Sequence, residues 1–163
     1  MNMIRSFIQK PASPALVEYT LCFVRIAIGL LTIGHGIPKI IGGPDVWLTV
    51  GTPISLIGIH FLPTAWGLLA GCAEALGGLA FVLGLGTRLA ALPLSFMMVV
   101  AFIMHWHNGD PYNVYSFALT MLVIFIAFLF IGSGRFSLDY YFYHKSKSAD
   151  EYHPLMNRPE DYL

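Results

Sequence analysis

Four long apolar runs constrain the fold of this chain more than any other feature of its sequence. They cover residues 19–41, 63–85, 88–106 and 113–132, and each is long enough to cross the hydrocarbon core of a bilayer as a helix. Apolar and polar residues do not alternate within the runs, as they do in the strands of a membrane barrel. Charged residues make up only 11% of the chain, which excludes an ordinary soluble domain. The sequence therefore predicts an all-α integral membrane protein, built as one bundle of four transmembrane helices.

The segments outside the four runs differ in character. Residues 1–18 precede the helical domain, which we place at residues 19–137. Residues 42–62 stay apolar but contain two prolines and several glycines, which predicts an interfacial or re-entrant segment between the first two helices. We expect this segment to anchor the chain at the membrane surface; alternatively, it covers a pocket. Residues 138–163 begin as an aromatic interfacial stretch and continue as a charged tail, which we expect to be disordered or bound to a partner.

The basic residues predict the orientation of the bundle. Lysine and arginine are enriched in the cytoplasmic loops of membrane proteins. In a four-helix topology only Lys39 falls at one end, whereas the opposite end receives Arg5, Lys10, Arg88, Arg135, Lys145, Lys147 and Arg158. We therefore expect a multi-pass protein with both termini in the cytoplasm.

A glutamate, Glu74, lies near the middle of the second apolar run. A carboxylate at that depth costs about 2.5–3.5 kcal/mol on insertion scales, so we expect it to have a partner or a function. The other residues on this face of the helix have no side chain. Gly67, Gly71, Glu74 and Gly78 are spaced by four, three and four residues, which places them on the same side. Small residues of this kind allow a neighbouring helix to approach closely.

The first helix carries a matching polar face. Its members are spaced by three or four residues and are Arg25, Gly29, Thr32, Gly36 and Lys39. We expect the two faces to meet in an antiparallel helix pair, with an extended Arg25 side chain reaching Glu74. Such an ion pair would relieve the burial cost of both charges. Two interpretations of the pair stay open: it fixes the register of the helices, or it takes part in substrate or proton chemistry.

Further polar residues predict a pocket in the outer half of the bundle. Pro38 kinks the first helix and leaves the carbonyl of Gly34 without its amide donor, beside His35. The candidate ligand-binding residues are His35, Gly36, Lys39, His105 and Tyr115. Histidines near a tryptophan more often form hydrogen bonds at the membrane interface than bind a metal or haem. We therefore predict no metal site and no built-in cofactor.

Three stretches of the sequence resemble the DoxX family, and they occur in the family's order. They are residues 25–39 (RIAIGLLTIGHGIPK), 74–92 (EALGGLAFVLGLGTRLAAL) and 132–139 (GSGRFSLD), so the resemblance covers roughly residues 19–140. It implies a small four-helix protein of the bacterial inner membrane. The family includes subunits related to the membrane thiosulfate:quinone oxidoreductase, and other members associate with oxidative-stress proteins. The positions that match its pattern are Arg25, Gly29, His35, Gly36, Lys39, Glu74, Gly77, Gly78, Arg88 and Asp139.

Three functions are compatible with these residues. The first is a subunit or accessory of a membrane oxidoreductase that binds a quinone, with Glu74, Arg25 and His35 as the candidate catalytic residues. None of these side chains stores electrons, so a redox partner subunit would carry them. The second is a non-enzymatic scaffold that recruits a partner or forms a homo-oligomer, and the third is a transporter of protons or a small solute. No nucleic-acid-binding pattern is present. Residues with an expected structural role are Gly29, Gly67, Gly71, Gly78 and Arg88.

Overall fold

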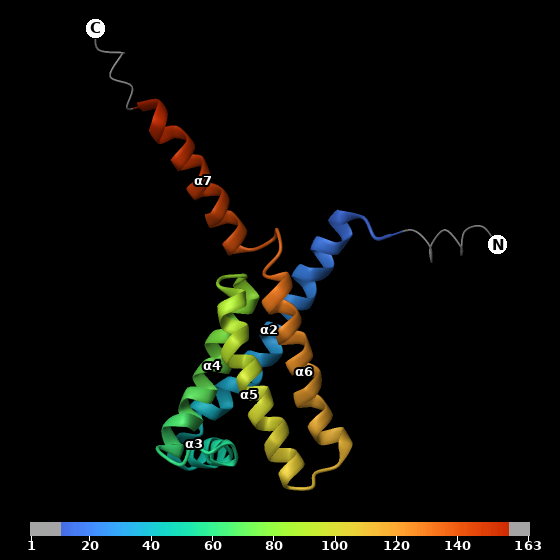
Figure 1. Cartoon of the computed structure of the whole chain (residues 1–163), viewed down its shortest axis with the longest axis vertical. Coiled ribbons are helices and arrows are strands. Elements are labelled where there is room, and N and C mark those ends of the chain that lie inside the picture. The colour runs from blue at the N-terminus through green and yellow to red at the C-terminus, as the bar shows by residue number, and fades with distance from the viewer. Residues whose placement is uncertain (1–10, 157–163) are drawn as a thin grey trace, which may run out of the picture.

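The computed structural model describes residues 11–156 and is helical along most of this length (Figure 1). Residues 1–10 and 157–163, which include Arg5, Lys10 and Arg158, lie outside the described part. The elements follow in the order α2 (Pro14–Ile41), α3 (Gly43–Gly51), the 3-10 helix η1 (Thr52–Ile57), α4 (Pro63–Leu83), α5 (Thr87–His107), α6 (Tyr112–Ile131) and α7 (Leu138–Met156). Helices α2, α4, α5 and α6 are long and apolar enough to cross a membrane, which confirms the predicted fold class.

The first helix begins at Pro14, within the segment that the sequence assigned to the region before the bundle. Ser13 forms the N-cap, and its side-chain hydroxyl accepts a hydrogen bond from the Leu16 amide at 3.3 Å. Pro14 then occupies the first turn, where its missing amide proton is not needed. A capping serine followed by proline therefore starts the helix before the apolar run itself begins.

The four spans are arranged as two pairs. Helix α2 packs along α4, and α5 packs along α6. In Figure 1 the pairs lie together at the end where the chain termini leave the bundle and separate toward the end that holds α3. We refer to these as the terminal end and the α3 end. Near the terminal end the pairs share a core in which Phe81 of α4 contacts Phe125 and Phe128 of α6, with ring centroids 5.5 and 5.1 Å apart.

Glycines bring the backbones of α2 and α4 into contact. A Cβ at Gly29 would lie 2.6 Å from the Gly78 carbonyl oxygen, and a Cβ at Gly36 would overlap the Ala75 amide. Both glycines are buried, as are Gly71 and Gly78 on the facing side of α4. Any larger side chain at these positions would force the helices apart.

The connection between α2 and α4 folds as α3 and η1, neither of which is long enough to span the membrane. The indole nitrogen of Trp47 donates to the carbonyls of Lys39 and Ile40 at 2.9 and 3.2 Å, which fastens α3 to the end of α2. Gly51 and Gly67 permit close packing on α4, because a Cβ at either position would overlap backbone atoms. The segment is thus held against the bundle at the α3 end.

The chain leaves the bundle through a short loop and continues as α7. The Asp139 carboxylate accepts hydrogen bonds from the amides of Gly86 and Thr87 at 2.8 and 3.4 Å, so the start of α7 caps the turn between α4 and α5. Helix α7 (Leu138–Met156) covers residues 144–156 of the predicted tail. Figure 1 shows α7 extending away from the four spans.

The α2–α4 contact predicts opposite effects for two nearby glycines. Gly36→Ala should lower the free energy of unfolding by roughly 1–3 kcal/mol, because the added methyl group has no space against α4. Gly34→Ala is the matched control: no atom of another helix lies within 4 Å of its Cβ position, and alanine favours a helix by up to about 1 kcal/mol. Thermal unfolding in micelles measures both. Equal effects of the two substitutions would contradict the close helix contact.

Candidate functional site

A cavity of about 530 Å³ lies where the two helix pairs separate, in the half of the bundle nearer to α3. Its walls come from α2, α4, α5 and α6, and five residues of α3 and η1 line it at the α3 end: Thr49, Val50, Gly51, Pro53 and Ile54. Most of the lining is apolar, with Met98, Phe117 and Phe125 among the larger side chains. The polar side chains of the four spans that line it are Thr32, His35, Lys39, Glu74 and His105. Part of the segment between α2 and α4 therefore forms one end of the cavity.

An ion pair between Lys39 and Glu74 forms the polar part of this cavity. The Lys39 Nζ atom lies 2.6 Å from Oε1 of Glu74. The glutamate side chain is only 3% exposed, whereas that of the lysine is 27% exposed. The second carboxylate oxygen of Glu74, Oε2, is buried and has no hydrogen-bond partner. A buried acceptor without a donor costs free energy, so it is a natural position for a ligand hydrogen bond.

Arg25 does not pair with Glu74, and the sequence-based prediction of that ion pair is wrong. The guanidinium is 1% exposed and donates to the carbonyls of Phe81, Val82 and Phe136, the last two at 2.9 and 2.8 Å. The final carbonyls of a helix lack intrahelical partners and carry partial negative charge, which attracts a cation. Arg25 reaches the C-terminal turn of α4 at the terminal end, and Lys39, fourteen residues later in α2, reaches Glu74 instead.

Of the four remaining residues predicted to bind a ligand, two line the cavity and two do not. His35 is exposed at the edge of the cavity, with its ring centroid 5.3 Å from that of Phe117. His105 also lines the cavity, and its Nδ1 atom is hydrogen-bonded to Oδ2 of Asp110 at 2.7 Å. Tyr115 lies outside the lining and packs against the rings of Phe102, Trp106 and Tyr112. Gly36 faces α4 in the helix contact and does not line the cavity.

The residues with an expected structural role lie in two parts of the bundle. Gly29, Gly67, Gly71 and Gly78 are buried between helices, as described above. Arg88 is exposed at the terminal end and donates to the Phe130 carbonyl at 3.0 Å. Within the described part of the chain, no three histidine, cysteine, aspartate or glutamate side chains are close enough to hold a metal ion.

Sequence reasoning missed several residues of the site. Asp110 follows His105 by five residues across the Asn-Gly turn, and that turn geometry was the available signal for their contact. The methionines of α5, Met97, Met98 and Met104, line the cavity with Met121 of α6. Flexible methionine side chains fill irregular spaces and adapt to ligands of different shape. No local pattern indicated which of them face the cavity.

Comparisons with known proteins find a family model and a curated relative that match this chain. The model of the DoxX family matches residues 20–106, a segment that runs from α2 to α5 and includes both members of the Lys39–Glu74 pair. An uncharacterised protein of Haemophilus influenzae is 32% identical over 134 residues, which cover 78% of this chain and 93% of that protein. No solved structure matches the chain.

The site predicts which charged residues are energetically coupled. Lys39→Met should be more destabilising alone than with Glu74→Gln, because it leaves a buried carboxylate without its cation; we expect a coupling of roughly 0.5–3 kcal/mol. Arg25→Met and Glu74→Gln should instead be additive within about 0.5 kcal/mol. Double-mutant cycles of unfolding in micelles measure both couplings. Strong coupling of Arg25 to Glu74 without coupling of Lys39 to Glu74 would overturn the assignment.

Proposed function

This chain belongs to the DoxX family of membrane proteins, and we propose that it binds a quinone-type ligand between its two helix pairs. In this proposal it serves as a subunit or accessory of a membrane oxidoreductase. The supporting observation is the buried Oε2 atom of Glu74, which has no partner although it lies in an otherwise largely apolar cavity. Ligand pockets commonly combine apolar walls with a few convergent polar groups.

The cavity has the chemical features that a quinone head group requires. Phe96, Phe117 and Phe125, which belong to α5 and α6, line the cavity and offer apolar surface to a flat ring. On the opposite wall Lys39 has further N–H donors for a ligand carbonyl, since Glu74 uses only one of three. Glu74 Oε2 can accept from a ligand hydroxyl. The polar and apolar walls thus suit a ring with oxygen substituents.

The side chains of this chain hold and move protons in the proposal, and a partner subunit carries the electrons. Glu74 is placed to take a proton from a bound hydroxyl or return one, while Lys39 stabilises its charged form. The hydrogen-bonded pair of His105 and Asp110 lies at the α3 end of the same cavity, where a proton can exchange with the aqueous side. The proposal gives Arg25 no proton role, because Arg25 lies outside the cavity lining and its terminal nitrogens donate to backbone carbonyls near the terminal end.

The proposal places the protein in the bacterial inner membrane with both termini in the cytoplasm. Arg88, Arg135, Lys145 and Lys147 lie at the terminal end, as the positive-inside rule requires of a cytoplasmic surface. The cavity then lies in the outer half of the membrane. Leu69 and Phe96 line it and are 56% and 44% exposed, which gives a lipid-soluble ligand an apolar route from the bilayer.

Partner recruitment is a second candidate function, and α7 favours it. This helix extends beyond the four spans, and its first turns expose Tyr141, Phe142 and Tyr143. Exposed aromatic residues on a projecting helix suit contact with another protein or with the membrane surface. The two candidates are compatible, since a quinone-binding subunit needs a redox partner.

Filling the cavity should remove ligand binding. We expect Ala73→Phe to weaken binding of ubiquinone-1 at least about tenfold, because Ala73 lines the cavity and a phenyl group would occupy it. Quenching of tryptophan fluorescence measures binding, since Trp66 also lines the cavity. Leu76→Phe is the control, because Leu76 is 66% exposed and lies outside the lining. Equal affinity of all three proteins would reject this binding site.

Replacing the carboxylate tests the proton role separately. Glu74→Gln keeps the size of the side chain and a carbonyl acceptor but removes the acid–base group. In membranes that contain the redox partner, quinone turnover should fall about 10²-fold or more, while ubiquinone-1 binding changes little. Full turnover by Glu74→Gln would exclude proton transfer at this residue and leave it a binding role.

A further inference from the structure

A second hollow, of about 410 Å³, lies at the terminal end, away from the cavity. It is bounded by the start of α5, the loop between α6 and α7, the first turns of α7, and Glu18 of α2. We propose that this hollow binds the headgroup of an anionic phospholipid from the adjacent leaflet. The inference is independent of the quinone proposal, because no residue lines both spaces.

Two guanidinium groups in the hollow are available to an anion. Arg88 donates to the Phe130 carbonyl at 3.0 Å, which uses one of its five N–H donors. Arg135 lies 5.9 Å from the centre of the Tyr140 ring, a contact that orients the guanidinium without using its donors. Neither arginine forms an ion pair with a carboxylate of residues 11–147. A phosphodiester can therefore accept hydrogen bonds from both.

The two carboxylates of the hollow are already engaged by backbone amides. Oε2 of Glu18 accepts from the Arg135 amide at 2.8 Å. Asp139 accepts from the amides of Gly86 and Thr87, at the turn before α5. These bonds fix the loop and the turn that carry the two arginines. The acidic groups thus shape the hollow, and the guanidinium donors remain for a ligand.

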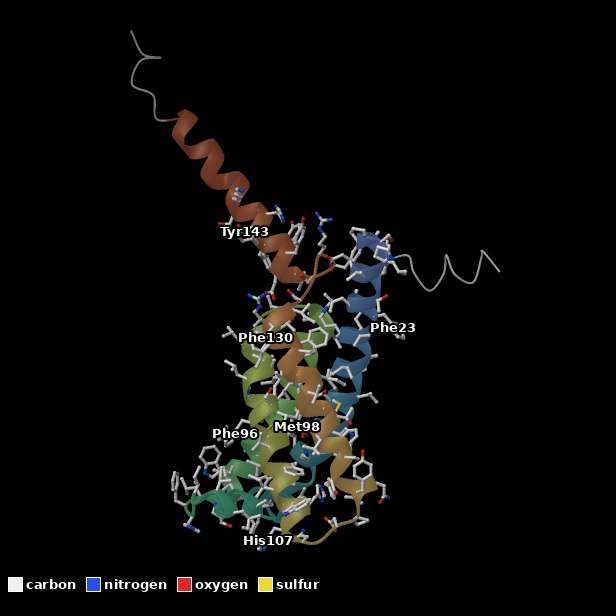
Figure 2. The ribbon with its side chains drawn as sticks, turned by 45° about the vertical axis from the view of Figure 1, so that its right-hand side comes forward. Phe23, Phe96, Met98, His107, Phe130 and Tyr143 are labelled. Atoms are coloured by element: carbon white, nitrogen blue, oxygen red, sulfur yellow. The ribbon has the colours of Figure 1, made fainter. Side chains whose placement is uncertain are left out.

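The residues that line the hollow beside the two arginines favour a lipid over a free anion. Leu89 and Ile131 line the hollow and are 74% and 60% exposed, so acyl chains can lie along them. Tyr140 and Tyr143 also line it, and tyrosines concentrate at the level of lipid headgroups. Figure 2 shows Tyr143 and Phe130 at this same end of the molecule. Arginines with free donors at the level of the headgroups are suited to anionic lipids.

The test is lipid binding by purified full-length protein, followed by native mass spectrometry. The probes are phosphatidylglycerol, phosphatidylcholine with the same acyl chains, and inorganic phosphate as a competitor. We expect phosphatidylglycerol to remain bound and phosphatidylcholine to dissociate. The double variant Arg88→Gln/Arg135→Gln should bind phosphatidylglycerol about thirtyfold more weakly. Arg135→Gln alone, which disturbs no backbone hydrogen bond, should bind it roughly fivefold more weakly.

The matched control removes the same charge outside the hollow. Lys145→Gln/Lys147→Gln lies on α7, and neither lysine lines the site, so phosphatidylglycerol should stay bound as in the unmodified protein. Equal loss in the control and in the arginine variants would overturn the proposal, because it would show general charge attraction. Equal retention of both lipids would also overturn it. Displacement of phosphatidylglycerol by millimolar inorganic phosphate would assign the hollow to a free anion instead.

Discussion

The backbone contact between α2 and α4 is the constraint on which the rest of the structure depends. Because glycines face each other along this contact, side chains on α2 reach α4 over short distances. The two cations of α2 consequently bind α4 at different heights. Lys39 meets the carboxylate of Glu74, and Arg25 binds the carbonyls at the C-terminal turn. Larger residues in the contact would separate the helices and leave both charges buried without partners.

The cavity arises because the two helix pairs pack less closely against each other than the two helices within each pair. The pairs share a tight aromatic core near the terminal end, where a short glycine-containing turn joins α4 to α5. Toward the α3 end they separate (Figure 1), and residues of α3 and η1 line the cavity at that end. The ionic groups of the cavity centre then lie on α2 and α4, facing methionines and aromatic rings of α5 and α6. The cavity therefore has one wall with charged groups and another that is mainly apolar and aromatic.

Much of the architecture followed from the sequence, because its signals are local and repeated. Apolar runs predicted the four spans, and the three- and four-residue spacing of Gly29, Gly36 and Lys39 placed them on the face that meets α4. The ion-pair partner of Glu74 could not be predicted from this spacing. Arg25 and Lys39 share a face, and counting residues along the helix did not account for the backbone carbonyls at the terminal end that hold Arg25. The exclusion of Tyr115 from the cavity depends on how α5 and α6 pack, which a single sequence does not encode locally.

The central claim is that the cavity beside Lys39 and Glu74 holds a quinone-type ligand. Native mass spectrometry of protein extracted gently from membranes of its own host tests it most directly. The account predicts a retained quinone mass, and predicts that this mass is absent when Ala73→Phe fills the cavity. Recovery of the unmodified protein with phospholipid alone, or with the same quinone bound to the filled variant, would contradict it.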